Sequence, residues 1–595
     1  MGDPLLIFPP DVPDVSPLDR FKPIEPITDI PKIDAPPPVQ PVKRTKDPKV
    51  DAFFLPPVDD SDPLVFRGDI EDSLNVTPII DGNEIFAELE PAIANAESSV
   101  LIAFWAFDPG MKAVTDPSVT WMDLLLEAVE NGAMVRVLFN DFDSGLQVEP
   151  HAVAWERYWT MLTAAVNAGT RADKFQVVCS HHEAETSRDT MKAVRPELYK
   201  TVAAELNKLP VSTRKRVFSV APGLWTKLNL KHSKLEEIFA GHSYSAFPAT
   251  HHQKIVIVDG KIAFTGGLNV TDQYLDTPKH RKRELPWHDV FVKVEGATVR
   301  QFVRNFIGLW NQERLRAEAF LKDAYRAMVF KVHARPMIGP TSNLTEAMIP
   351  TVLTSALPAK IPSQVHRTIT KKGTADSGVP IVIRKDILEG YVQAISQAES
   401  FIYLENQYFR EEIIADAIVK QHKDKPDLQT IILLPKVIEE FLKSKGDELS
   451  QHGAALQFEL LDKMNRAIGS KLGLFTLERN DKKLVYVHSK LLIIDDKFAS
   501  IGSANCNPRS FKMDTELDFV WFNEAVAQKL RIDLWKEVLG NPSGLDSWKP
   551  AEFITKWTEI AKKNKRSRRT RKGFVVPFDN STKGKKSFFP ITPFT

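Results

Sequence analysis

Two short segments of this 595-residue chain carry the same reactive residue types at the same spacing. The pattern His-x-Lys-x4-Asp begins at His252 and again at His488. Each copy contains a run of four aliphatic residues and continues into a turn of small residues that ends in Asn. The matched residues are His252, Lys254, Asp259, Gly266, Gly267 and Asn269 in the first copy, and His488, Lys490, Asp495, Gly502, Ser503 and Asn505 in the second.

Phosphoryl transfer through a covalent intermediate needs this set of residue types. One imidazole attacks phosphorus and a second protonates the departing oxygen, because one histidine cannot easily do both. Two lysines and two asparagines neutralise and orient the non-bridging oxygens, which metal ions do in many other phosphoryl-transfer enzymes. The small residues after each strand let the backbone approach the phosphate. This set predicts one site built from both copies, with no metal and no cofactor.

The strands that must position these groups are visible in the pattern. A His and a Lys two positions apart on a strand point to the same face. The runs IVIV and LLII that follow read as strands buried on both faces. Asp259 and Asp495 then fall at the strand ends, where we expect structural caps and not reactive groups.

A second repeat supports a duplicated α/β architecture. The segment Ala92–Ser98 reads AIANAES and Ala394–Ser400 reads AISQAES, so five of seven positions are identical. Each ends a helical pattern and runs into a strand, and a second helix and aliphatic strand follow in both places. This order predicts two α/β halves and not an all-β barrel.

These motifs resemble the double His-Lys-Asp signature of the phospholipase D superfamily. The stretches PWHDV (Pro286–Val290) and LENQYF (Leu404–Phe409) look like strands of true phospholipases D. The run NPRSF (Asn507–Phe511) is shared with cardiolipin synthases and discriminates less.

The resemblance implies two pseudo-twofold-related α/β halves with the active site at their interface, and a phosphohistidine intermediate. It implies that His252 is the nucleophile and that His488 is the general acid that later activates water. It also implies that a carboxylate orients each imidazole. The family pattern pairs these crosswise, Glu516 with His252 and Asp289 with His488.

The implied activity is hydrolysis of the head-group phosphodiester of glycerophospholipids to phosphatidic acid, with transfer to an alcohol as a variant. Three alternatives remain. A cardiolipin-synthase-like phosphatidyltransferase is disfavoured by the absence of N-terminal spanning helices. A nuclease of the same superfamily is disfavoured by a formal net charge of only +1. A catalytically dead membrane scaffold is disfavoured because no catalytic position is missing.

Partners and location follow from the same reasoning. We expect a monomer, since both motifs lie in one chain, acting peripherally on a phospholipid membrane surface with no nucleic-acid partner. No apolar run approaches the roughly 18 residues of a spanning helix, and the N-terminus lacks the features of a signal peptide. We therefore expect a cytoplasmic or peripheral membrane protein, with secretion independent of a signal peptide as a further option.

Composition divides the chain into five stretches. Sixteen of the 41 prolines fall in residues 1–63, which predicts an extended or disordered leader. The first half is expected over 64–330, a linker over 331–378 and the second half over 379–545. Residues 546–595 read as a tail with eight Lys or Arg between residues 561 and 573 and several Phe, suited to anionic lipid.

One further cluster contains metal-ligand types. Cys179, His181, His182 and Glu183 match no standard zinc spacing, so we expect no metal there. Cys179 and Cys506 are the only cysteines, and we expect both to be reduced.

Overall fold

The computed structural model describes residues 47–185, 198–238, 247–281, 283–329, 339, 341–351, 361–373, 380–436, 448–567 and 571–579. These residues belong to one compact unit, Val42–Thr595. The first part of the expected leader, 1–46, lies outside the described residues.

The first half is a seven-stranded mixed sheet. Three parallel strands, β4 (Phe175–Ser180), β3 (Met134–Asn140) and β2 (Ser99–Phe104), continue into an antiparallel series. That series is β7 (Ile255–Val258), β8 (Ile262–Gly266), β10 (Val290–Gly296) and β1 (Glu71–Ile80).

The second half repeats this order strand for strand. Its parallel strands are β15 (Leu472–Glu478), β14 (Gln429–Leu433) and β13 (Phe401–Glu405). Its antiparallel series is β17 (Leu491–Ile494), β18 (Phe498–Gly502), β19 (Glu516–Phe522) and β11 (Ile361–Lys371). The prediction of two related α/β halves is confirmed.

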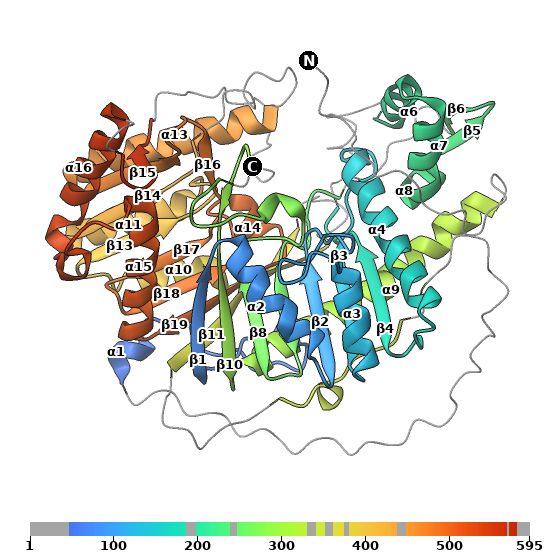
Figure 1. Cartoon of the computed structure of the whole chain (residues 1–595), viewed down its shortest axis with the longest axis horizontal. Helices are drawn as coiled ribbons and strands as arrows, with labels where there is room; N and C mark the ends of the chain where they lie inside the picture. Colours follow the sequence, from blue (N-terminus) through green and yellow to red (C-terminus); the bar gives the residue numbers. More distant parts are fainter. Residues whose placement is uncertain are drawn as a thin grey trace. The chain divides into compact units, whose positions relative to one another are not determined.

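In each half, corresponding helices cover the outer face of the sheet, and one further helix, α9 (Val299–Val329) or α15 (Glu524–Leu539), packs into a shared core between the halves (Figure 1). Hydrophobic residues of the inner strand faces, from both halves, form one cluster with residues of α9 and α15. The corresponding helices are α2 (Gly82–Ala94) with α10 (Asp386–Ile395), α3 (Trp121–Glu130) with α11 (Glu412–Asp424), α4 (Val148–Asn167) with α13 (Glu448–Ile468), and α9 with α15.

The halves are joined edge to edge through β1 and β11. Glu71 pairs with Ser363 and Ser73 with Ile361 in an antiparallel register. The expectation of a linker over 331–378 is therefore wrong for residues 361–371. The sequence IPSQVHRTITK hid this strand because its buried polar side chains are hydrogen bonded inside the protein; for example, the Ser363 and Ser73 hydroxyls are 2.7 Å apart.

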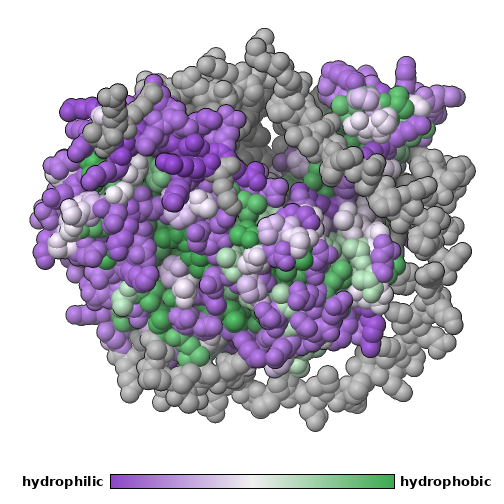
Figure 2. All heavy atoms as spheres, in the orientation of Figure 1, coloured by the Kyte–Doolittle hydropathy of each residue, from purple (hydrophilic) through white to green (hydrophobic). Residues whose placement is uncertain are grey.

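The expected tail, 546–595, is also partly folded. Helix α16 (Phe553–Arg566) buries Phe553, Trp557 and Ala561 at a spacing of four residues, and β20 (Val575–Pro577) pairs with β15. The lysines of α16 face outward, and hydrophilic residues dominate the visible face over α13 and α16 (Figure 2). The apolar residues of α16 recur at helical spacing, but the many basic residues obscured this pattern in the sequence. This is why the segment was expected to be a tail and is instead a packed helix. Residues 580–595 and their Phe side chains lie outside the described residues.

The described end of the leader is ordered too. Phe53 and Phe54 are buried against the ring of Phe498 in the second half, after the short helix α1 (Pro48–Asp51). Of the two alternatives for the leader, extended or disordered, the disordered one does not hold for this stretch, because two adjacent aromatic side chains bury enough surface to order it.

The first half carries an addition that has no counterpart among the described residues of the second half. It consists of α6 (Leu198–Lys208), α7 (Val211–Val220), α8 (Pro222–Trp225) and the hairpin β5 (Leu228–Lys231) with β6 (Lys234–Glu237). It precedes β7, the aliphatic strand inside the first motif. Among the described residues, no helix is long and apolar enough to cross a membrane.

Candidate active site

The motif aspartates fix the two halves internally. Asp259 accepts hydrogen bonds from the backbone N–H groups of Glu97, Ser98 and Ser99, and Asp495 accepts from those of Glu399, Ser400 and Phe401. Both aspartates adopt positive φ angles, 54° and 53°. The carboxylates thus cap the repeated AES turns, which explains why those turns and the motifs recur together.

Each histidine is paired with a carboxylate from the opposite half. His252 Nδ1 lies 2.8 Å and 3.0 Å from the two carboxylate oxygens of Glu516. His488 Nδ1 lies 2.7 Å from Asp289 Oδ2. This is the crosswise pairing that the resemblance implies. It leaves Nε2 of each imidazole available for chemistry.

Backbone hydrogen bonds bring the opposite halves to these positions. The N–H of His252 donates to the carbonyl of Thr515, and the N–H of His488 donates to the carbonyl of His288, at 2.9 Å and 2.8 Å. Thr515 and His288 directly precede the two orienting acids. Each motif therefore holds the other half's acid in register.

The lysines lie beside the imidazoles, whereas the contacts of the asparagines are with other groups. Lys254 Nζ donates to the carbonyl of His252 at 2.6 Å, and Lys490 makes the same contact with His488. Asn269 accepts from the N–H of Ala106 and donates to the Tyr274 hydroxyl. Asn505 Oδ1 is buried and has no hydrogen-bond partner among the described residues. The predicted histidines, lysines and orienting acids therefore lie together, while their chemical roles and the part played by the two asparagines stay predictions.

The difference between Gly267 and Ser503 has a structural reason. A Cβ atom at Gly267 would lie 2.2 Å from Asp289 Oδ1, so no side chain fits there without moving the acid. At the corresponding place Ser503 Oγ donates to Glu516 Oε2 at 2.5 Å. Gly266 and Gly502 are also confined, the first by Phe291 and the second by Asp518.

Burial shifts the pKa values of the two histidines and the two lysines of the motifs. The pKa of His252 lies well below its ordinary value because of burial and the nearby charge of Lys254, and the pKa of His488 is lowered by burial and by Lys490. Burial also lowers the pKa of Lys254 to about 7 and that of Lys490 to about 8. Each lysine acts on both imidazoles, so the two halves form one electrostatic unit.

The pKa values of the two orienting acids, Asp289 and Glu516, are shifted upward. Burial raises the pKa of Asp289 and that of Glu516 to about 7, against the opposing effect of the lysines. An anionic phosphodiester entering this site would restore the positive charge of both lysines.

Aromatic side chains line the histidines. The ring of Trp105 lies 6.0 Å from that of His252, and the rings of Trp287 and Tyr274 lie 4.8 Å and 5.3 Å from that of His488. Such walls limit water around the imidazoles.

Several supporting residues were not singled out from the sequence. Asp514 accepts from the N–H of Thr250 at 2.7 Å and from Arg509, and Ser510 Oγ accepts from the N–H of Asn505. Glu405 accepts from Ser489, next to His488. Arg509, Ser510 and Glu405 lie in the stretches quoted for the resemblance, but their partners are distant in sequence.

The four residues discounted as metal ligands make separate contacts. The His181 ring packs on Phe247 at 4.2 Å, His182 Nε2 lies 3.0 Å from the Thr515 hydroxyl, and Glu183 faces Arg316. Cys179 and Cys506 are both buried and free.

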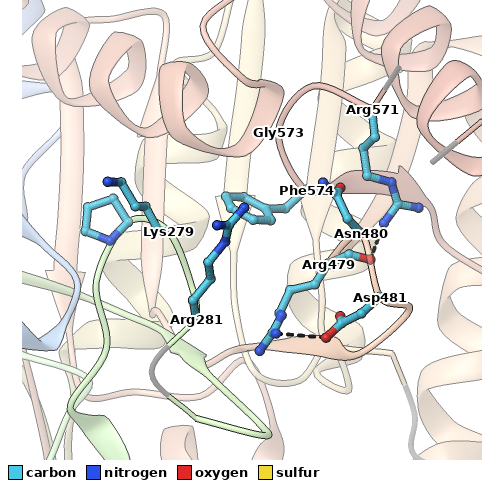
Figure 3. Close-up of a pocket in the computed structure, with 9 residues that line it drawn as sticks. Lys279, Arg281, Arg479, Asn480, Asp481, Arg571, Gly573 and Phe574 are labelled. Carbon is cyan, nitrogen blue, oxygen red and sulfur yellow. Dashed lines mark hydrogen bonds and ion pairs between the residues drawn. The ribbon is translucent and has the colours of Figure 1, made fainter. Parts of the chain in front are cut away.

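A pocket of about 520 Å³ is lined by residues other than the two motif histidines. Figure 3 shows its lining side chains. Basic side chains converge on it from the loop before β9 (Trp287–His288), from the turn after β15 and from the segment after α16. Its lining residues are Pro278, Lys279, Arg281, Arg479, Asn480, Asp481, Arg571, Gly573 and Phe574. Arg571 and Phe574, expected in a free tail, are thus part of the folded wall.

Two protein-family models match the chain. The model described as "Phospholipase D" matches residues 281–445, and that described as "Cardiolipin synthase, PLD-like domain" matches residues 391–537. The second range contains His488, Lys490 and Glu516, and neither contains His252.

Curated relatives match parts of the chain at low identity. Human Phospholipase D1 is 28% identical over 274 residues, covering 39% of this chain and 24% of the human protein. Phospholipase D alpha 4 of Arabidopsis thaliana is 24% identical over 421 residues, covering 54% and 51%. Cardiolipin synthase 1 of Staphylococcus epidermidis is 26% identical over 290 residues, covering 48% and 47%. The chain therefore spans about a quarter to a half of the length of these relatives.

Among solved structures, a phosphatidylserine synthase of Haemophilus influenzae aligns with a TM-score of 0.46 and 13% identity, covering 84% of this chain and 96% of that one.

The family models and the curated relatives indicate a protein of the phosphodiesterase and phosphotransferase class, and the duplicated fold agrees with it. These matches place the chain in its family: it belongs to the phospholipase D superfamily.

Proposed function

We propose that the protein is a phospholipase D, which hydrolyses the head-group phosphodiester of glycerophospholipids to phosphatidic acid. The observation that carries this proposal is the pair of imidazoles whose Nδ1 atoms are each held by a carboxylate while two buried lysines stand beside them. This arrangement supplies a nucleophile, an acid and charge compensation at one phosphorus atom.

In the first step His252 Nε2 attacks phosphorus and the bond from phosphorus to the head-group oxygen breaks. The lowered pKa of His252 keeps its Nε2 lone pair free, and Glu516 accepts a hydrogen bond from the Nδ1–H group. His488 Nε2–H donates its proton to the departing oxygen. Binding of the anionic phosphate next to His488 favours the protonated imidazole that this step needs.

In the second step water attacks the phosphohistidine. His488 takes a proton from the water, the phosphorus–nitrogen bond breaks, and phosphatidic acid leaves with His252 restored. An alcohol in place of water gives the transfer product. Lys254 and Lys490 stabilise the charge on the non-bridging oxygens throughout.

A cardiolipin-synthase-like phosphatidyltransferase is the second candidate, favoured by the family model over residues 391–537. It would use the same phosphohistidine and differ only in its acceptor, a lipid alcohol. In both cases the protein acts as a monomer at a phospholipid surface, without a nucleic-acid partner.

The test incubates the purified protein with mixed vesicles of phosphatidylethanolamine, phosphatidylcholine and phosphatidylglycerol, with and without 1-butanol, and separately with plasmid DNA. We expect phosphatidic acid, and phosphatidylbutanol when the alcohol is present. Cardiolipin as the main product would favour the transferase, and nicked DNA with intact lipid would contradict both candidates.

Two variants test the residue roles. His252→Ala should abolish product formation, whereas His488→Asn should accumulate a phosphatidyl adduct on the peptide that contains residue 252, detected by mass spectrometry. His422→Gln is the matched control, since His422 is a buried histidine that bonds only the Thr430 hydroxyl among the contacts described. An active His252→Ala protein would remove the nucleophile assignment.

A further inference from the structure

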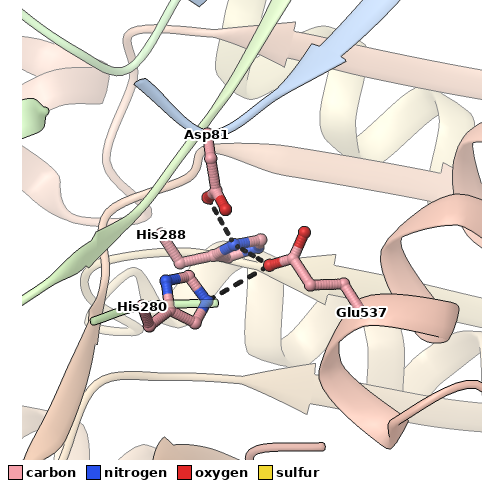
Figure 4. A group of neighbouring side chains, drawn as sticks. All are labelled: Asp81, His280, His288 and Glu537. Carbon is pink, nitrogen blue, oxygen red and sulfur yellow. Dashed lines mark hydrogen bonds and ion pairs between the residues drawn. The ribbon is translucent and has the colours of Figure 1, made fainter. Parts of the chain in front are cut away.

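A second group of buried histidines and acids meets outside the two catalytic pairs. Asp81 lies between β1 and α2, His280 lies in the loop before β9, His288 belongs to β9 and Glu537 to α15. Their potential ligand atoms all lie within 4.8 Å of one another, and Figure 4 shows the four side chains pointing toward a common centre. All four side chains are at most 7% exposed.

The contacts within this group are close but do not form a good hydrogen-bond network. His288 Nδ1 lies 3.1 Å from Asp81 Oδ1 and 3.0 Å from Glu537 Oε1, and a single N–H cannot serve both oxygens well. His280 Nε2 lies 3.2 Å from the same Glu537 oxygen. Among the described residues, His280 Nε2, Asp81 Oδ2 and Glu537 Oε1 are buried without a hydrogen-bond partner of acceptable geometry.

Each imidazole is oriented from behind by a further carboxylate. His280 Nδ1 lies 2.7 Å from Asp276 Oδ2, and His288 Nε2 lies 3.1 Å from Glu405 Oε2. Glu405 is itself fixed by the Tyr403 hydroxyl at 2.6 Å. A carboxylate on the far nitrogen is the usual support of a metal-bound histidine, because it fixes the tautomer and the ring orientation.

The backbone is strained where it presents two of these side chains. Asp81 has φ 64° and ψ 152°, a region that only glycine adopts without cost, and His280 has φ 49°. Asp81 also occupies the N-cap position of α2 without capping it through its side chain. Its carboxylate points to the two histidines and does not accept a hydrogen bond from the first turn of α2.

We propose that Asp81, His280, His288 and Glu537 bind a divalent transition-metal ion, with Zn²⁺ the best match. Two imidazole nitrogens and two carboxylate oxygens are a complete tetrahedral ligand set for zinc. Bonds of about 2.0–2.1 Å would separate such ligands by roughly 3.4 Å, close to the separations of the converging pairs. With four protein ligands and no open position, the site is structural and not catalytic.

The alternative to a metal ion is protonation of both histidines, which would make the group a cluster of ion pairs. With Asp276 and Glu405 included, four carboxylates and two imidazolium groups carry the same net charge as four carboxylates, two neutral imidazoles and one Zn²⁺. The net charge therefore does not distinguish the zinc-bound state from the doubly protonated state. The atoms without partners do separate them, because a proton on His280 Nε2 finds no acceptor of good geometry, whereas a metal ion would bind His280 Nε2 and Glu537 Oε1 together.

A metal here would tie the halves together beside the active site. Three ligands come from the first half and Glu537 comes from the second. His288 directly precedes Asp289, the acid that holds His488, and its carbonyl accepts from the His488 N–H. The ion would fix the position of Asp289, but the proposal does not depend on which reaction the enzyme performs.

The test begins with the metal content of the full-length protein, grown with zinc and purified without chelators, measured by plasma mass spectrometry. We expect about one zinc per chain. Dialysis against dipicolinate should remove the metal and lower the Tm by several degrees, and added Zn²⁺ should restore it. Replacement by Co²⁺ should give the strong visible absorption of a tetrahedral site.

Variants assign the metal to these residues. His280→Gln and Glu537→Gln should each lose the stoichiometric metal, while the buried-histidine control His422→Gln should keep it. Protein that contains no transition metal as purified, and takes up none on addition of Zn²⁺, would overturn the proposal. So would stoichiometric metal that both ligand variants retain. The wild-type measurements decide the question even if a variant fails to fold.

Discussion

Replacing Glu516 by glutamine tests how the nucleophile is held. The glutamate accepts from His252 Nδ1 through both oxygens, at 2.8 Å and 3.0 Å, while Ser503 Oγ donates to one of them. Glutamine keeps the shape but offers one acceptor oxygen and an NH₂ group. The Ser503 hydroxyl and the imidazole N–H then compete for that single oxygen.

The size of the fall in kcat depends on which donor the glutamine oxygen accepts from, the imidazole N–H or the Ser503 hydroxyl. If the amide oxygen stays on His252, only the charge assistance of the hydrogen bond is lost, about 1.5–3 kcal/mol, or roughly 10- to 160-fold in rate. If the NH₂ group faces Nδ1, the imidazole must carry its proton on Nε2, the attacking atom. The loss then approaches about 10⁴-fold, the size seen when the acid of a catalytic triad becomes an amide. We expect a fall in kcat between these limits, with KM little changed.

The assay is release of phosphatidic acid from vesicles, with thermal unfolding measured in parallel. Glu90→Gln is the matched control, since Glu90 is a fully buried glutamate that accepts from the N–H groups of Val114 and Thr115 and touches neither histidine in the contacts described. A Glu516→Gln enzyme that loses no more kcat than Glu90→Gln would refute the reasoning, because the carboxylate would then not set the tautomer.

Three further outcomes follow from the geometry. Gly267→Ala should displace the Asp289 carboxylate, since the added Cβ would lie 2.2 Å from it, and lower kcat by about 10-fold or more with an unchanged fold by circular dichroism; full activity would show that the acid need not stay in place. Asp259→Ala should lower the free energy of unfolding by about 2 kcal/mol in urea titrations, because three backbone N–H groups lose their acceptor, yet leave the kcat of the folded enzyme near wild type. The pH profile of kcat/KM should rise on an acidic limb up to about pH 7, because the nucleophilic histidine with its lowered pKa must be neutral and the orienting acids Glu516 and Asp289, with pKa values of about 7, must ionise. It should fall above pH 7 to 8 as the motif lysines, with pKa values of about 7 and about 8, lose their charge; a profile flat to pH 10 would contradict these lysine assignments.

Local spacing determined much of the site. A His and a Lys two apart on a strand face one side whatever the rest of the chain does, and the duplicated aliphatic run predicted the duplicated sheet. The same spacing predicted the capping role of Asp259 and Asp495, whose hydrogen bonds go to the AES turns. These features could be predicted because each depends on a few neighbouring residues.

Composition predicted the linker and the C-terminal tail less well. The strand Ile361–Lys371 and the helix Phe553–Arg566 were hidden by polar and basic residues respectively. Burial of polar side chains depends on partners elsewhere in the chain, which no local pattern reveals.

Thus the sequence alone determined the duplicated α/β halves and the reactive His and Lys, since these depend on period and repetition. The family resemblance implied that Glu516 pairs with His252 and Asp289 with His488; no local pattern in the chain shows these contacts, because the register between opposite halves sets them. Only the tertiary structure brought Asp81, His280, His288 and Glu537 to one point. These four show no metal-binding spacing along the chain, and long-range packing of the two halves decides that they meet.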